Sequence, residues 1–142
     1  LCDERAGVVA AVHCGWCGTV ADIAGAAVEK MTRSFGCRPE DIRAAIGPGI
    51  SVCCFETGPE VPEAVEKLLG ADAAGTYHDE EGVPGKSMVD LKEVNRRRLL
   101  QLGVPAERID VSEDCTMCGG ERYWSHRATH GVRGTQASVI ML

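Results

Sequence analysis

Apolar residues follow two periodicities along the chain, and these predict the main elements. Residues 7–13, GVVAAVH, form a continuous apolar run, which is typical of a strand buried on both faces. Residues 19–35 carry apolar side chains at spacings of three and four, which indicates a helix with one buried face. Thr19 is the expected N-cap of this helix and Gly36 its end.

The same two patterns recur further along. Strands are expected at 42–46, 108–113 and 136–142, and helices at 58–70 and 91–103. The later helix has Asp90 as its expected N-cap and stops at Gly103. Residues 71–87 and 115–135 show no periodicity and are expected to be loops. The alternation predicts a single α/β domain with a mixed sheet and packed helices.

Charge and composition limit the classes of molecule that the protein is expected to bind. The 142 residues suit one domain, and the net charge is −6. An acidic chain gains nothing from counterion release, so nucleic acid is not an expected partner. No apolar run approaches the roughly 18 residues needed to span a bilayer, and no leader pattern is present, so we expect no membrane contact and a cytoplasmic location. The eight cysteines are then thiols, metal ligands or catalytic groups rather than a disulfide framework.

Two Cys-x-x-Cys pairs leave several interpretations open. Cys14 and Cys17 stand between a predicted strand and a helix, where a redox dithiol would lie and the helix dipole would lower the pKa of the first thiol. Together with Cys115 and Cys118 they could form a tetrahedral zinc site, although about a hundred residues separate the pairs. Each pair could also be inert thiols at a turn.

The other candidate ligands are weaker. Cys53 and Cys54 are neighbours, and neighbours in a strand point to opposite faces, so at most one should face a given site. His13 ends the first strand before a Gly-rich turn, where ligands collect in α/β folds, but it could equally be structural. His126, beside Arg127, is either an anion or base contact or part of a surface loop.

Several motifs, taken in order, resemble one known family. The stretch AVHCGWCGTVADI is similar to AVHAGWRGT of the laccase-domain, or polyphenol oxidase, family, whose members are regarded as purine nucleoside phosphorylases. AAIGPGISVCCFETGPEV, VDLKEVNRRRLLQLGVPAERIDV, CTMC and YWSHRATHGVRGTQASVIML match its later motifs. The resemblance implies that residues 1–142 are the C-terminal portion of a single laccase-like domain lacking its N-terminal part.

The resemblance also implies a chemistry and a metal. The expected reactions are phosphorolysis of adenosine, inosine, guanosine or methylthioadenosine-class nucleosides, and deamination of adenosine. The family's zinc, sometimes copper, is held by two His and one Cys, and His13 matches the last of these ligands. The other two belong to Gln-Val-His-Gly and Thr-Ala-Asp-Cys motifs, neither of which occurs in this chain. Arg127 is the expected substrate-binding residue, with Arg122 and Arg133 as further candidates for phosphate or ribose.

Some positions depart from the family pattern. Cys17 replaces the usual Arg, Cys14 replaces an Ala, and Gly134-Thr135 stands where Gly-Arg is usual. If those arginines bind phosphate, phosphorolysis is in doubt. The alternatives are a copper-binding polyphenol oxidase, a catalytically silent fragment that pairs symmetrically as a homo-oligomer to cover an open strand edge, and a thiol redox protein. A multicopper oxidase needs paired His-x-His motifs, which four scattered histidines do not supply.

Overall fold

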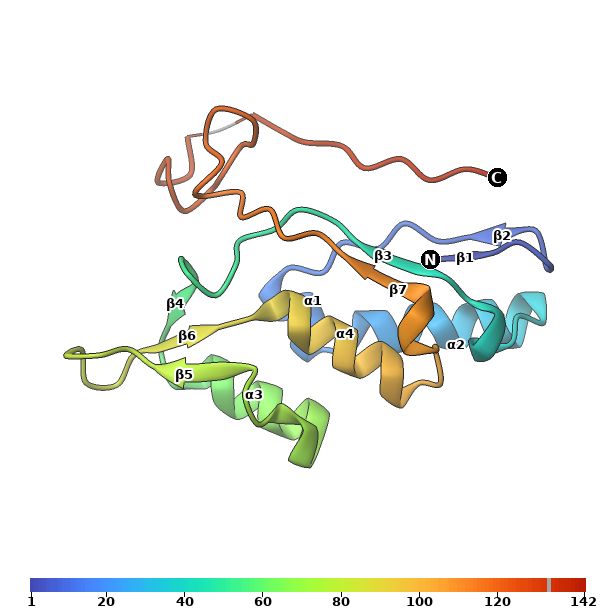
Figure 1. Ribbon diagram of the computed structural model, residues 1–142, viewed down its shortest axis with the longest axis horizontal. Coiled ribbons are helices and arrows are strands. Elements are labelled where there is room, and N and C mark those ends of the chain that lie inside the picture. Colours follow the sequence, from blue (N-terminus) through green and yellow to red (C-terminus); the bar gives the residue numbers. More distant parts are fainter. Residues whose placement is uncertain (133) are drawn as a thin grey trace.

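Short strands lie along one side of helices α1, α2 and α4 in the computed structural model, which describes residues 1–132 and 134–142 (Figure 1). The helices are α1 Trp16–Val20, α2 Ile23–Phe35, α3 Glu60–Leu69 and α4 Leu91–Gln101. The strands are β1 Cys2–Asp3, β2 Val8–Val9, β3 Ala44–Ile46, β4 Glu56–Thr57, β5 Tyr77–Asp79, β6 Ser87–Val89 and β7 Ile109–Val111. Three 3-10 turns, η1 Pro39–Asp41, η2 Gly70–Ala73 and η3 Ala106–Arg108, connect them.

Parallel and antiparallel pairings coexist, which confirms the mixed α/β class. Strand β3 pairs in parallel with β7, so that Ala44 lies beside Ile109 and Ile46 beside Val111. Strands β1 and β2 form an antiparallel pair, and β4, β6 and β5 form an antiparallel sheet in that order. The strands expected at 42–46 and 108–113 are therefore present, each as a three-residue core.

Helix α4 joins two apolar clusters. At its C-terminal end Leu99 packs with α2 and β3 residues such as Met31 and Ala44. At its N-terminal end Leu91 and Val94 pack with α3 and β6. The predicted N-cap is confirmed, since the Asp90 carboxylate accepts a hydrogen bond from the Glu93 amide at 3.0 Å.

The helix expected over 19–35 is broken in two, and its expected N-cap is wrong. Asp22 adopts a left-handed backbone with φ of 61° and caps α2 by accepting from the Gly25 amide at 3.1 Å. Arg98 of α4 clasps the same carboxylate with two bonds of 2.8 and 2.6 Å. Thr19 instead lies buried within α1, while Gly36 ends α2 as expected.

Three further expectations were wrong in extent. The loop expected at 71–87 contains β5 and the start of β6, joined by a polar hairpin with positive φ at Gly82 and Gly85. The strand expected over 7–13 is limited to β2, which is half-buried. The structure assigns no strand to the expected segment 136–142, where Val139, Met141 and Leu142 have exposed side chains. No helix in the described residues is long and apolar enough to cross a membrane.

Candidate functional site

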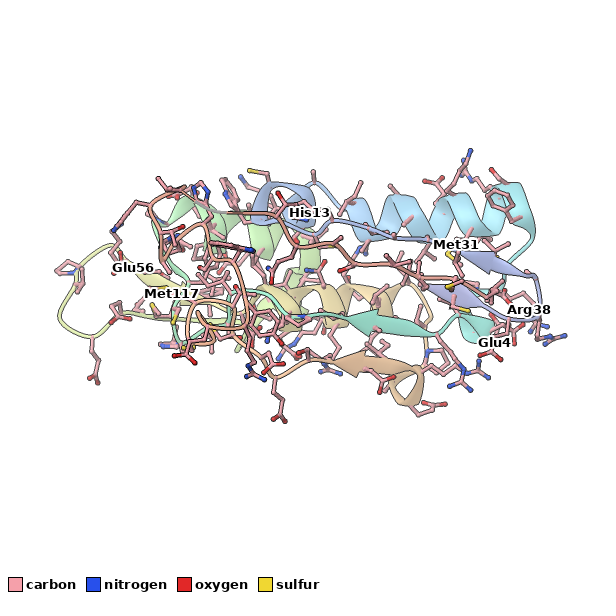
Figure 2. The ribbon with its side chains drawn as sticks, turned by 90° about the horizontal axis from the view of Figure 1, so that it is seen from above. Glu4, His13, Met31, Arg38, Glu56 and Met117 are labelled. Carbon is pink, nitrogen blue, oxygen red and sulfur yellow. The ribbon has the colours of Figure 1, made fainter. Side chains whose placement is uncertain are left out.

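A surface pocket of about 290 Å³ lies where α1, β4 and the start of α3 meet the loop after Tyr123. Glu56 and Met117 lie toward one end of the molecule and Glu4 and Arg38 at the other, with His13 between them (Figure 2). The pocket lining is aromatic and charged, and consists of Trp16, Phe55, Glu56, Thr57, Gly58, Glu60, Val61, Lys86 and Arg127.

Arg127 is held in place at this pocket by two contacts. Its Nη1 donates to the Glu56 carbonyl oxygen at 2.9 Å, and its guanidinium carbon lies 5.5 Å from the centre of the Phe55 ring. A cation at that distance from a ring is attracted by the ring quadrupole. Lys86 adds a second cation, paired with the Glu56 carboxylate at 3.5 Å. Aromatic faces suit a planar heterocycle, and the cations suit an anion.

His13 is exposed on the loop between β2 and α1, three residues before the pocket residue Trp16. Gly15 lies against the imidazole of His13, since a Cβ at position 15 would come within 3.2 Å of His13 Nε2. No group of three ligand-type side chains that includes His13 occurs in the described part of the chain. The residues present therefore supply at most one ligand at His13 and do not by themselves fit a metal ion there.

A buried contact that the sequence did not reveal anchors the His13 turn. Asn95 of α4 donates to Thr19 Oγ1 at 3.0 Å, and this hydroxyl donates to the Cys14 carbonyl oxygen at 3.4 Å. Asn95 also donates to the Leu91 carbonyl oxygen at 2.7 Å. The only signal was the Asn-Arg pair of one family motif, which says nothing of a contact across 76 positions.

Arg122, the other arginine candidate among the described residues, lies outside the pocket lining. Arg122 donates to Asp114 Oδ1 at 3.3 Å and lies over the Tyr123 ring. Arg133 lies outside the described residues. His126 is exposed in the turn before Gly131, and its carbonyl accepts from the Gly131 amide at 2.9 Å.

The first Cys-x-x-Cys pair lacks the expected electrostatics. Burial raises the pKa of Cys14, although the positive N-terminus opposes the change, so the lowered pKa expected of a redox dithiol is absent. Cys17 is exposed at the start of α1. The alternative that joined this pair to Cys115 and Cys118 is not the one found, because the sulfurs that lie close to Cys115 and Cys118 belong to Cys53 and Cys54.

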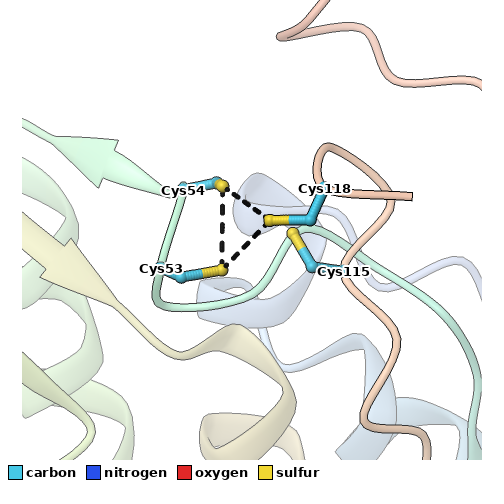
Figure 3. Close-up of side chains that lie close together, drawn as sticks. All are labelled: Cys53, Cys54, Cys115 and Cys118. Carbon is cyan, nitrogen blue, oxygen red and sulfur yellow. Dashed lines mark hydrogen bonds between the residues drawn. The ribbon is translucent and has the colours of Figure 1, made fainter. Parts of the chain in front are cut away.

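Four cysteines from two turns converge instead. Ligand atoms of Cys53, Cys54, Cys115 and Cys118 all lie within 4.8 Å of one another (Figure 3). The Cys54 and Cys118 sulfurs are 3.4 Å apart, the Cys53 and Cys54 sulfurs 3.6 Å, and the Cys53 and Cys118 sulfurs 3.7 Å. Four soft sulfurs at these spacings could hold a metal ion.

Turns explain why the expectation for Cys53 and Cys54 was wrong. The amides of Cys54 and Phe55 both donate to the Ser51 carbonyl oxygen, at 2.9 and 3.0 Å, so this segment is a tight turn and not a strand. In a turn, neighbouring side chains can point the same way, whereas a strand would send them to opposite faces. Likewise the Gly119 amide donates to the Cys115 carbonyl oxygen at 2.9 Å and closes the turn that carries Cys118.

Three of the clustered thiols have shifted pKa values. Burial raises the pKa values of Cys53 and Cys54, and hydrogen bonding to Cys118 raises both further. Burial acts the same way on Cys115, but backbone amides of Cys118, Ser51 and Met117 donate to its sulfur and lower its pKa to about 6. The Ser51 amide lies 3.4 Å from that sulfur. These three amides favour the thiolate form of Cys115.

Comparison with known proteins shows which family the chain matches. The family described as multi-copper polyphenol oxidoreductase laccase matches residues 1–142. The chain is 38% identical over 135 residues to "Purine nucleoside phosphorylase YlmD" of Geobacillus stearothermophilus, which covers 95% of this chain and 48% of that protein. It is 42% identical over 130 residues to "Adenosine deaminase RL5" of an unknown prokaryotic organism, covering 89% and 47%.

The fold agrees with these sequence matches. The crystal structure of YlmD from Geobacillus stearothermophilus superimposes with a TM-score of 0.78 at 38% identity, over 84% of this chain and 44% of that one. The chain thus spans about half the length of the curated relatives named here.

Proposed function

The chain belongs to the family described as multi-copper polyphenol oxidoreductase laccase, and from this we propose that it works as part of a zinc-dependent purine nucleoside phosphorylase that also deaminates adenosine. Relatives named purine nucleoside phosphorylase and adenosine deaminase support the reaction class. The proposed substrates are adenosine, inosine, guanosine or methylthioadenosine, with phosphate as the second substrate.

One observation carries the proposal: two motifs far apart in sequence meet at one pocket. Trp16 of the His-x-Gly-Trp motif and Arg127 of the Ser-His-Arg motif both line it. We assign Trp16 and Phe55 to the planar base and Arg127, with Lys86, to the phosphate or ribose. The bond from Arg127 to the Glu56 carbonyl orients the guanidinium before the anion arrives, which lowers the entropic cost of binding.

We propose that His13 is the ligand that this chain provides to the metal ion. Its exposed imidazole is at the edge of the Trp16 turn, and the Asn95–Thr19–Cys14 contact holds that turn to α4. A metal ion with an open coordination position supplies an activated water or polarises an oxygen. Among the described residues no group of three ligand-type side chains includes His13, so the proposal assigns the remaining ligands to the Gln-Val-His-Gly and Thr-Ala-Asp-Cys motifs of the family.

The test is phosphate-dependent release of base from inosine and adenosine. It uses these 142 residues joined to a segment that carries the Gln-Val-His-Gly and Thr-Ala-Asp-Cys motifs. We expect His13→Ala to abolish release, while His78→Ala, on the exposed strand β5, leaves it unchanged. Unimpaired release by His13→Ala would refute the role of His13. Oxidation of a phenol with copper but no release of base would refute the reaction class.

Arg127 has a matched control on its own loop. A charged hydrogen bond is worth roughly 1.5–3 kcal/mol, so Arg127→Ala should raise the KM for phosphate by roughly tenfold or more. Arg122→Ala removes an arginine that binds Asp114 outside the pocket lining and should leave this KM unchanged. Equal effects of the two substitutions would show that the loop, and not the pocket cation, matters.

A further inference from the structure

We propose that Cys53, Cys54, Cys115 and Cys118 form a tetrahedral thiolate zinc site that clamps the two walls of the pocket together. The site uses none of the residues assigned to purine chemistry. A test of this zinc site can therefore fail without contradicting the proposed function, and the reverse also holds.

The spacing of the sulfurs is the first argument. A tetrahedral zinc with Zn–S bonds of about 2.3 Å holds its sulfurs about 3.8 Å apart. The sulfurs of Cys53, Cys54 and Cys118 are 3.4, 3.6 and 3.7 Å apart, just below this value. These three separations are nearly equal, so the three sulfurs form a triangle with the Cys115 sulfur beside it (Figure 3). No single pair of sulfurs is much closer than the others, as it would be if the two were placed to form a disulfide. A small shift outward would accommodate the ion.

The donor set is the second argument. Four sulfurs in tetrahedral array select zinc or an iron–sulfur cluster, and a single set of four spaced for one ion favours zinc. Metal-bound thiolates are commonly oriented and stabilised by a second shell of hydrogen-bond donors. The Ser51 amide already donates to the Cys115 sulfur at 3.4 Å. Zinc binding displaces the remaining thiol protons into solvent, which Cys53 and Cys118 reach because both are exposed.

The backbone brings the two turns together before any metal arrives. Gly49 and Cys115 form a parallel bridge beyond the β3–β7 pair, and the Thr116 amide donates to the Gly49 carbonyl oxygen at 3.0 Å. A preformed site of this kind loses less chain entropy on binding than one assembled by the metal.

The position of the cluster gives it a role. Cys54 directly precedes Phe55 and Glu56, which form one wall of the pocket, and the Cys115–Cys118 turn leads into the loop that carries Arg127 on the other wall. A metal bound to both turns would hold Arg127 at its bond to Glu56. The four-sulfur site leaves no open position, so its role is structural and not catalytic.

The experiment measures zinc bound to the reduced 142-residue chain after gel filtration without free metal. We expect about one zinc per chain. Cys53→Ser and Cys118→Ser change exposed side chains, so they should fold normally yet lose zinc affinity by more than the roughly 10- to 100-fold typical of outer-shell changes. Cys17→Ser removes an exposed thiol outside the cluster, and His13→Ala removes the other candidate ligand; both should keep the zinc.

Two further readouts separate the possible failures. Cobalt in place of zinc should give the visible absorption of tetrahedral thiolate ligation in the wild type and lose it in Cys118→Ser. Zinc should also slow amide exchange of Cys54, Phe55 and Thr116 while leaving α2 unchanged. The proposal is overturned if the reduced chain takes up no zinc, if Cys53→Ser and Cys118→Ser retain it, or if His13→Ala or Cys17→Ser loses it equally. A disulfide within the cluster in chain kept under reductant would also overturn it.

Discussion

Removing the buried amide of Asn95 should destabilise the chain and loosen the turn that carries His13. Asn95 is only 5% exposed, and its side chain donates to Thr19 Oγ1 and to the Leu91 carbonyl oxygen. Only the first of these bonds crosses between elements, from α4 to α1. Asn95→Ala removes both bonds and leaves the Thr19 hydroxyl without its donor in a buried place.

The expected size follows from these contacts. Each hydrogen bond contributes about 1 kcal/mol net. Alanine is a better helix former than asparagine by roughly 0.6 kcal/mol, which offsets part of the loss in α4. We therefore expect the free energy of unfolding to fall by about 1.5 kcal/mol, and the Tm by roughly 3–6 °C.

A double-mutant cycle with Thr19→Val isolates the bond between the helices. Valine keeps the shape of threonine but removes the hydroxyl that accepts from Asn95 and donates to Cys14. Urea unfolding of the wild type, both single variants and the double variant should give a coupling free energy near about 1 kcal/mol. In Asn95→Ala, the Thr19 amide, bonded to the Gly15 carbonyl oxygen at 2.8 Å, should exchange faster with solvent.

The baseline comes from an exposed residue on another helix. Lys67→Ala, on α3, combined with Asn95→Ala should be additive within about 0.3–0.5 kcal/mol. If the Asn95–Thr19 coupling is no larger than this baseline, the contact does not stabilise the fold and cannot anchor the His13 turn. Unchanged exchange at Thr19 in Asn95→Ala would contradict the anchoring separately.

Three other predictions concern titration and packing. Hydrogen bonds from Arg96 and Arg97 outweigh burial, which acts in the opposite direction, and lower the pKa of Glu93 to about 2. The stabilisation by Glu93 is therefore complete above about pH 4.5 and is lost as the pH falls toward 2, and Glu93→Gln should flatten this part of the curve of unfolding free energy against pH. Ser51 Oγ is buried with no partner among the described residues, so Ser51→Ala should leave stability unchanged or raise it by up to about 1 kcal/mol in urea unfolding. Met31, 2% exposed, should cost about 2–5 kcal/mol when replaced by alanine, whereas Phe35→Ala on the same helix, 55% exposed, should cost well under about 1 kcal/mol by the same measurement.

Local signals predicted the elements whose ends they specify. Asp90 and Gly36 cap α4 and α2 as expected, because capping depends on residues within one turn of the helix. The break at Asp22 between α1 and α2 could not be predicted from neighbouring residues, because the Asp22 carboxylate binds Arg98, which is 76 positions away. The hairpin of β5 and β6 was not predicted, because its polar sequence has no alternation of apolar and polar residues. It forms part of a sheet in which β6 also pairs with β4.

The pocket was predictable only in parts. The family motifs single out His13 and Arg127, and the structure places Arg127 in the pocket lining while His13 lies three residues from it. No pattern in the sequence says that Arg127 would lie over Phe55 or bond to Glu56, because those contacts depend on how the loop after Tyr123 crosses β4.

The sequence shows all four cysteines of the cluster, but it does not show the pairing of β3 with β7 that brings them together. Each residue of β3 lies beside the residue 65 positions later in β7. Cys53 stands as far beyond Ile46 as Cys118 stands beyond Val111, and the same offset of 65 separates the two cysteines. The parallel pairing of β3 with β7, continued by the Gly49–Cys115 bridge at an offset of 66, brings the Cys-Cys turn and the Cys-x-x-Cys turn to the same end of the paired strands. Strands of three residues are too short for sequence to identify that pairing, so the convergence of the four sulfurs becomes visible only when the register is known.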